Sequence, residues 1–248
     1  MSFSIQLGNF LYKHAFWLYR PMYTAFKNRQ DHFEIELLKQ HLKPGDVVLD
    51  IGANIGYYAE LIAQLVGEKG RVHCFEPDST NFKHLQNRCR GVSNLVLNHK
   101  AVGPKTEKLK IYTSKNLNVD HRTYEPEEYE DVIEIEALSI DDYLKDKEQK
   151  VHLIKMDIQG FEMQAVQGMK NTLKTNPGLK IISEFWPYGL RKAGSSALAY
   201  FDFLTQHGFT VHLLKNKGLE ALTSDKVKSM NDLGEETYFN ILATPSHV

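Results

Sequence analysis

The chain has 248 residues, 42% of them hydrophobic, and a formal net charge of −1. Its length and composition predict one fairly large domain, or a domain with a small extension. The near-neutral charge gives no support to nucleic-acid binding, so no nucleic-acid partner is predicted.

The cysteine content and the hydropathy of the chain indicate its cellular compartment. Cys74 and Cys89 are the only cysteines and form no metal or redox motif, so no metal site is predicted. No apolar run approaches the ~20 residues that a membrane-spanning helix needs. Residues 1–29 lack the order of a signal peptide. We therefore expect a cytoplasmic protein.

Aromatic side chains recur through the first thirty residues at spacings of four and three, which predicts one stripe along a helix. The stripe consists of Tyr12, Phe16, Tyr19, Tyr23 and Phe26. Because proline interrupts a helix, we expect two short helices that meet at Pro21. They form an extension docked on the domain, a lid over an active site, or a contact with a membrane surface. A further helix begins at a capping-box-like Asp31 and ends before Pro44. We divide the chain into a helical extension, 1–43, and a main domain, 44–248.

Residues 46–66 form the strongest pattern in the chain, a buried strand that passes through a glycine turn into a helix. Such a turn directs unpaired backbone N–H groups at a ligand above the sheet, which predicts a nucleotide-type cofactor site. The dinucleotide fingerprint requires glycine where this chain has Asn54, and Asp50 ends the strand. An NAD-linked oxidoreductase is therefore the weaker interpretation.

Two further predicted strands also end in an acidic residue. Glu76 follows strand 71–75 about 20 residues after the glycines, where an acid that binds ribose hydroxyls is expected. Asp78 is predicted to cap the next helix, 81–90. Asp157 ends strand 151–156 and precedes a helix whose apolar face runs to Leu173. Since parallel strands end at one edge, we expect Asp50, Glu76 and Asp157 to converge on one crevice.

A predicted pair of strands, 108–113 and 131–137, is inserted after the third strand, 94–97. Residues 98–101 before it form either a shelf for an adenine ring or an ordinary loop. His121 and Arg122 lie between the paired strands, in a loop that either reads the substrate or is simply solvated. The acidic run 125–131 matches no calcium loop and is interpreted as a solvated face.

The remaining predicted elements complete a sheet. Strand 179–185 contains Glu184 at its end, and Trp186 and Tyr188 follow as a wall for a sugar or other ring. Gly194-Ser195 is expected to cap a helix at 197–207. Strands 209–214 and 236–243 come last, with a mobile loop at 225–234 between them.

Five segments together resemble the FkbM family of methyltransferases dependent on S-adenosylmethionine (SAM). They are Leu49–Gly56, Phe75–Pro77, Lys100–Gly103, Lys155–Glu162 and Glu184–Gly189. The resemblance covers roughly 44–244. It implies a class I methyltransferase fold, which is a Rossmann-like α/β sheet of seven strands with helices on both faces and the last strand antiparallel. It also implies O-methylation of a hydroxyl on a sugar, glycoside or polyketide-type small molecule.

With SAM as cofactor, the predicted binding residues are Asp50, Gly52, Ala53, Asn54, Gly56, Tyr57, Glu76, Pro77, Ala101 and Asp157. Candidates for the general base are His121, Asp157, Glu162 and Glu184, of which His121 and Glu184 are favoured, and Asp157 is assigned more to orientation. The predicted substrate contacts are Arg122, Gln159, Glu162, Trp186, Tyr188 and Arg191. A non-catalytic SAM-binding or membrane-docking module is the other alternative, and the sequence leaves the acceptor and the oligomeric state open.

Overall fold

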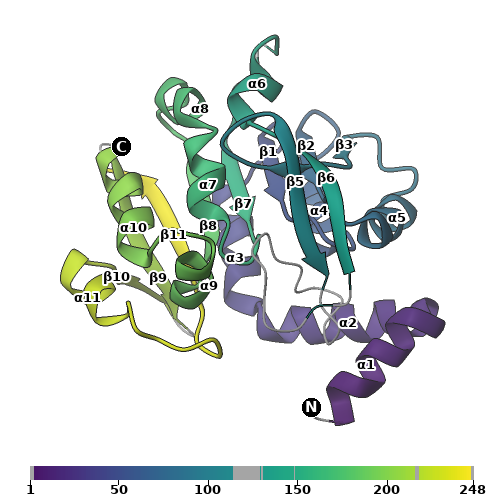
Figure 1. Ribbon diagram of the computed structural model, residues 1–248. Coiled ribbons are helices and arrows are strands. Elements are labelled where there is room, and N and C mark those ends of the chain that lie inside the picture. The colour runs from purple at the N-terminus through teal and green to yellow at the C-terminus, as the bar shows by residue number, and fades with distance from the viewer. Residues whose placement is uncertain (1–2, 114–128, 130, 148, 216–217, 247–248) are drawn as a thin grey trace.

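The protein is described here from a computed structural model, which defines residues 3–113, 129, 131–147, 149–215 and 218–246 (Figure 1). Eight strands form the main sheet. In spatial order they are β10 (Gly218–Ala221), β9 (Phe209–Lys215), β11 (Phe239–Pro245), β8 (Lys180–Phe185), β7 (Leu153–Met156), β1 (Val47–Ile51), β2 (Arg71–Phe75) and β3 (Leu95–Asn98).

The five strands from β8 to β3 are parallel, and β11 runs antiparallel between β8 and β9. This arrangement confirms the predicted sheet with its reversed last strand. The chain adds one strand that was not predicted, because β10 pairs antiparallel with β9 at the edge of the sheet. Three of the four residues of β10 are exposed, so it has no apolar alternation by which the sequence could reveal it.

Helices cover both faces of the sheet (Figure 1). Successive residues of β1 point to opposite faces, so Val48 belongs to one hydrophobic core and Leu49 to the other. The first core lies under α3 (His32–His41), α4 (Tyr57–Val66) and α5 (Ser79–Arg88). The second lies under α6 (Ile140–Leu144), α7 (Glu162–Gln167), α8 (Lys170–Thr175) and α10 (Ala197–Gln206).

A second sheet of three strands is inserted between β3 and α6. It contains β4 (Ala101–Val102), β6 (Asp131–Leu138) and β5 (Glu107–Thr113) in that order. The antiparallel pairing of β5 with β6 confirms the predicted pair of strands, and β4 joins it as a short parallel neighbour.

The N-terminal helices differ from the prediction at their junction. α1 (Phe3–His14) and α2 (Phe16–Gln30) meet at Ala15, and Pro21 lies inside α2. Pro21 removes one backbone donor near the start of the helix, and the helix continues through it. At the start of α3, Asp31 makes no side-chain capping bond, because its carboxylate accepts the Tyr58 hydroxyl at 2.6 Å instead.

Four local predictions after β7 are also corrected. The helix predicted after Asp157 is divided at Gly168 into α7 and α8, where a Cβ would lie 2.1 Å from the Gly103 carbonyl oxygen. Ser196, not Gly194-Ser195, caps α10. The segment expected to be a mobile loop contains α11 (Ser224–Ser229), capped by Thr223. An unpredicted helix, α9 (Pro187–Lys192), follows β8.

None of the described helices has both the length and the apolar character that crossing a bilayer requires.

Candidate functional site

The glycine turn after β1 brings backbone into direct contact with the end of β7. Gly52 has φ of 83°, and a Cβ there would lie 2.0 Å from the carbonyl oxygen of Asp157. Asn54 also has a positive φ, 50°, which asparagine tolerates better than most residues. The turn therefore positions Asp157 beside Gly52. The predicted unpaired N–H groups are not found, because Gly52 and Ala53 donate to the Phe75 carbonyl oxygen at 3.0 Å and Asn54 donates to Glu76.

Glu76 is held by that turn. Its Oε2 accepts the Asn54 backbone N–H at 2.8 Å, and its Oε1 accepts the Asp78 N–H at 2.9 Å. The residue is buried, and burial raises the pKa of its carboxyl group to about 8, despite the two N–H donors. Each carboxylate oxygen keeps a second lone pair for a ligand hydroxyl. Asp78 caps α5 through the N–H groups of Thr80 and Asn81, as predicted.

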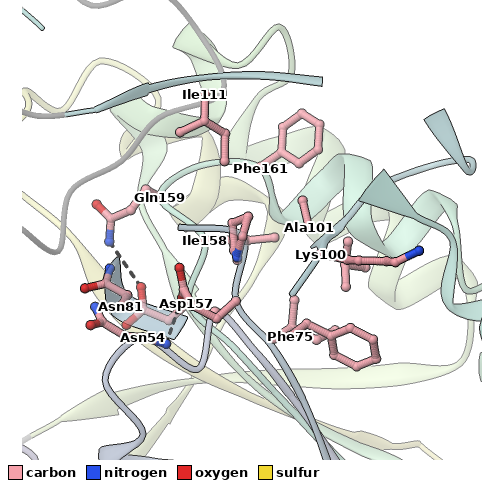
Figure 2. Close-up of a pocket in the computed structure, with 15 residues that line it drawn as sticks. Asn54, Phe75, Asn81, Lys100, Ala101, Ile111, Asp157, Ile158, Gln159 and Phe161 are labelled. Carbon is pink, nitrogen blue, oxygen red and sulfur yellow. Dashed lines mark hydrogen bonds between the residues drawn. The ribbon is translucent and has the colours of Figure 1, made fainter. Parts of the chain in front are cut away.

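Glu76 lines the smaller of two cavities at this edge of the sheet. Figure 2 shows Ile111 and Phe161 on one side of this cavity, with Asn54, Asn81 and Asp157 on the other. Ile111 comes from β5, so the inserted sheet supplies part of the wall. The cavity is thus a slot with one apolar side, one polar side and the buried carboxyl group of Glu76, which fits an aromatic ring attached to a ribose.

The larger cavity has a volume of about 590 Å³ and shares Gly52, Asn54, Asp157 and Gln159 with the smaller one. Among the described residues, its wall includes six carboxylate side chains and two lysines, Lys27 and Lys155. Aromatic side chains from distant segments complete it: Tyr23, Phe26, Tyr57, Tyr58, Trp186 and Tyr238. A positively charged group would therefore be favoured in this cavity, beside rings that suit a flat apolar surface.

A buried ion pair lies in the wall of the larger cavity. The Lys155 ammonium is 3.7 Å from Glu34 and 4.0 Å above the ring of Tyr58. Burial alone would lower the pKa of Lys155, but Glu34, Asp157 and Asp50 raise it above its ordinary value. Lys155 is therefore a charged group in the cavity. The sequence analysis gave it no role, because a lysine inside an apolar strand has no distinctive pattern.

The structure brings most of the predicted site residues to these two cavities. The smaller is lined by Gly52, Asn54, Glu76, Pro77, Ala101, Asp157 and Gln159. The larger is lined by Gly52, Ala53, Asn54, Tyr57, Asp157, Gln159, Glu184 and Trp186. The expected convergence is therefore found for Glu76 and Asp157.

Five predicted residues line neither cavity. Asp50 is buried in β1, where burial raises its pKa to about 6 and its carboxyl oxygens find no hydrogen-bond donor among the described residues. Glu162 is also buried, and accepts the Ile158 N–H at 3.1 Å. Gly56 lies against Leu85 at the start of α4.

The other two of these five residues lie on α9. Arg191 donates to the carbonyl oxygens of Asn231 and Leu233, and its guanidinium lies near the ring of Tyr188. Neither cavity supports contact of these five residues with a ligand, which therefore stays a prediction. His121, Arg122 and most of the acidic run at 125–131 lie outside the described residues.

Helix α2 and the segment before β11 contribute to the larger cavity. A lid over the active site was one alternative for the N-terminal helices, but none of the residues that these segments provide was predicted as a site residue. α2 provides Tyr23, Phe26, Lys27 and Gln30, and the segment before β11 provides Tyr238. Gln30 donates to the Tyr238 hydroxyl at 3.5 Å, which joins the two segments. The aromatic stripe at spacings of four and three was the only sequence signal for this contact.

Comparison with known proteins decides the family. A model of the methyltransferase FkbM domain matches residues 50–211, more than half of the chain. The chain belongs to the FkbM methyltransferase family. This FkbM domain contains the glycine turn, Glu76, Asp157 and Glu184.

Two curated relatives were found. The 2-O-methyltransferase NoeI of Sinorhizobium fredii is 28% identical over 147 residues, covering 53% of this chain and 60% of the relative. The hexuronic acid methyltransferase AglP of Haloferax volcanii is 26% identical over 144 residues, covering 57% of each protein. The match to this FkbM protein thus spans less than two thirds of either relative's length.

The crystal structure of an rRNA methylase from Streptococcus thermophilus shares the fold of this FkbM protein. The TM-score is 0.51 at 11% identity, and the match covers 86% of this chain and 95% of the other. At this identity the similarity supports the class I methyltransferase fold alone.

Proposed function

We propose that this FkbM protein transfers the methyl group of SAM to a hydroxyl group of a small acceptor, most specifically a sugar or glycoside. The observation that carries this proposal is the junction of two cavities at Asp157. One cavity is a ribose-and-ring slot that contains Glu76, and the other is acidic and aromatic. The activities named for NoeI and AglP support a sugar-type acceptor.

The residues of the smaller cavity fit the nucleoside part of SAM. When bound, the cofactor supplies an activated methyl group on a positively charged sulfur. Glu76 would accept the ribose hydroxyls through its free lone pairs, and Ala101 and Phe161 would contact the adenine ring. Asp157 lines both cavities, so it would orient the charged end of the cofactor toward the acceptor.

The larger cavity would hold the acceptor. Trp186 and Tyr238 would pack against a sugar ring, and Gln159 would bond its hydroxyl groups. Glu184 lines the same cavity and is the described candidate for the base that removes the proton of the acceptor hydroxyl. Such a base typically contributes about 10²–10⁴-fold. His121 stays the second candidate, and Arg122 a candidate substrate contact.

The position of α2 supports a lid role for this helix, because Tyr23, Phe26 and Lys27 form part of one wall of the acceptor cavity. In the proposed division of the chain, the extension, 1–43, would then form the lid, and the methyltransferase domain, 44–248, would contain the cofactor site. A membrane contact would have to use the opposite face of the same helix.

Calorimetric titration with SAM and a methyl-transfer assay with sugar acceptors test this function. We expect SAM to bind. When its methyl group is labelled, we expect the label to appear in the product formed from a hydroxylated acceptor. Binding without turnover on any hydroxylated acceptor would favour the non-catalytic alternative, and binding of NADH instead of SAM would favour the oxidoreductase. A pH–rate profile that is unchanged in both Glu184→Gln and His121→Ala would remove these residues as bases.

A further inference from the structure

One side of α2 is exposed and largely apolar. Its positions recur at intervals of one and three residues along the helix, as one side of an α-helix requires. Seven of them are Trp17, Leu18, Pro21, Met22, Ala25, Phe26 and Arg29, of which six are apolar, and the exposed Asn28 lies on the same side. Trp17 is 76% exposed and Met22 54% exposed. We call these seven residues the outer face.

The opposite side of α2 already has its partners in the domain. Arg20 pairs with Glu60 at 3.4 Å, Tyr23 contacts the ring of Tyr57, and Lys27 pairs with Asp31. Packing against the domain therefore explains only the inner residues. The large side chains of the outer face need another explanation, because single soluble domains seldom expose a contiguous apolar surface of this kind.

Helix α1 extends the same exposed region. Leu7 and Phe10 are exposed on α1, and Figure 1 shows α1 and α2 together along the lower edge of the molecule. Tyr12 fixes α1 to the domain, because its buried hydroxyl donates to Asn81 at 2.5 Å. The exposed region is therefore held in a defined position.

The charge of this segment indicates which surface it meets. Residues 1–30 contain four Lys and Arg residues and no Asp or Glu. Among these, Arg29 is exposed beside the apolar side chains, Arg20 pairs with Glu60, and Lys27 pairs with Asp31. An apolar helix face accompanied only by basic side chains is complementary to an anionic lipid surface. In a two-fold dimer the same face would meet itself, and bring like charges together.

We propose that the outer face of α2 docks this protein onto an anionic membrane surface, without crossing it. Trp17, Leu18 and Met22 enter the interfacial layer, and Arg29 contacts lipid headgroups. Phe26 belongs to the outer face and also lines the larger cavity. The docked protein therefore holds the larger cavity next to the bilayer. That this cavity takes the acceptor rests on the proposed function.

Binding to lipid vesicles tests this docking directly. The probes are vesicles of phosphatidylcholine with about 30% phosphatidylglycerol, and vesicles of phosphatidylcholine alone. We expect the full chain to float with the anionic vesicles and to be released as salt is raised. The chain has two tryptophans, and Trp186 is buried, so a blue shift of tryptophan emission would report insertion of Trp17.

The variant Trp17→Glu/Met22→Glu should need at least about tenfold more anionic lipid for half-maximal binding. Neither position lines a cavity, so calorimetric binding of SAM should be unchanged and would show that the variant is folded. Leu219→Glu is the matched control, since it charges an exposed apolar side chain on β10, and it should bind vesicles as the parent does.

Equal vesicle binding by the parent and the double variant would overturn the proposal, as would no binding by either. A dimer that the double variant dissociates, with no vesicle binding by the parent, would instead identify a surface for self-association. The proposed function fails separately: vesicle binding without SAM binding overturns the methyltransferase and leaves the docking intact.

Discussion

At the scale of single residues, Glu76 is the most direct test of the cofactor site. Replacing it with glutamine exchanges one carboxyl oxygen, which would accept a ribose hydroxyl, for an amide NH2 group that can only donate. We expect Glu76→Gln to weaken SAM binding by about 1.5–3 kcal/mol, or roughly tenfold to over a hundredfold in Kd, by calorimetry. The matched control is Glu162→Gln, a buried glutamate that lines neither cavity, which should leave the affinity unchanged. Equal affinities in all three proteins would refute the ribose assignment.

Gly52 tests the contact between the glycine turn and β7. A Cβ at this position would lie 2.0 Å from the Asp157 carbonyl oxygen, in addition to the strain of φ at 83°. We expect Gly52→Ala to lower the free energy of unfolding by about 2–4 kcal/mol in urea denaturation, because backbone must move. Gly45→Ala separates the two effects. Gly45 also has a positive φ, 96°, but open space around its Cβ position, so its cost should be only about 1 kcal/mol. Equal losses would show that strain alone explains Gly52.

At the scale of elements, the predictable parts are those whose pattern is local. The β1–turn–α4 unit was predicted because the buried strand, glycine turn and amphipathic helix are adjacent in sequence. Asp78 was predicted as a cap because capping depends on neighbouring N–H groups. The interruption at Gly168 could not be predicted, since it depends on the Gly103 carbonyl, which is remote in sequence. The same limitation applies to α11 and β10, which are short and largely exposed.

Helix α1 provides a prediction at this scale. Its attachment depends on Tyr12, which is buried and donates to Asn81, a residue of the smaller cavity wall. Tyr12→Phe removes only this hydrogen bond, which typically contributes about 0.5–1.5 kcal/mol. We expect amide hydrogen exchange in 3–14 to accelerate about two- to tenfold, while β1 and β7 stay protected. Phe10→Ala, on the exposed side of α1, should exchange as the parent does. Unchanged exchange in Tyr12→Phe would show that the ring contacts alone hold the helix.

At the scale of the whole molecule, the sequence predicted the order of the layers better than the arrangement of the site. Parallel strands that end in acids predicted a shared edge, and Glu76 and Asp157 meet there. Asp50 does not, because its strand is buried on both faces and its side chain lies within the sheet core. Only part of the larger cavity was predicted: Glu184 and Trp186 were predicted site residues that line it, whereas the residues of α2 and Tyr238 were not. Its wall combines α2, β7, β8 and the segment before β11, which only tertiary packing brings together.

The buried carboxyl groups predict how the stability of the whole molecule depends on pH. Burial raises the pKa of Glu76 to about 8 and of Glu162 to about 7, both above the ordinary value for glutamate in an unfolded chain. Between the ordinary pKa of glutamate and these raised values, the folded protein therefore binds more protons than the unfolded chain does. The resulting stability is fully present below the unfolded pKa and is lost as pH rises through about 7 and then about 8. His41, His73 and His84 have lowered pKa values, so they are neutral in both states above pH about 7 and do not oppose this trend.

We therefore expect the free energy of unfolding, from urea denaturation, to fall as pH rises from about 7 to about 9. Glu76→Gln should make this dependence shallower, because the amide stays neutral throughout, whatever its effect on stability at any one pH. Glu136→Gln is the control: this exposed glutamate pairs with Lys100, which lowers its pKa, so it is ionised in both states across the range. A slope that is the same in Glu76→Gln and Glu136→Gln would show that Glu76 is already ionised at neutral pH in the folded protein.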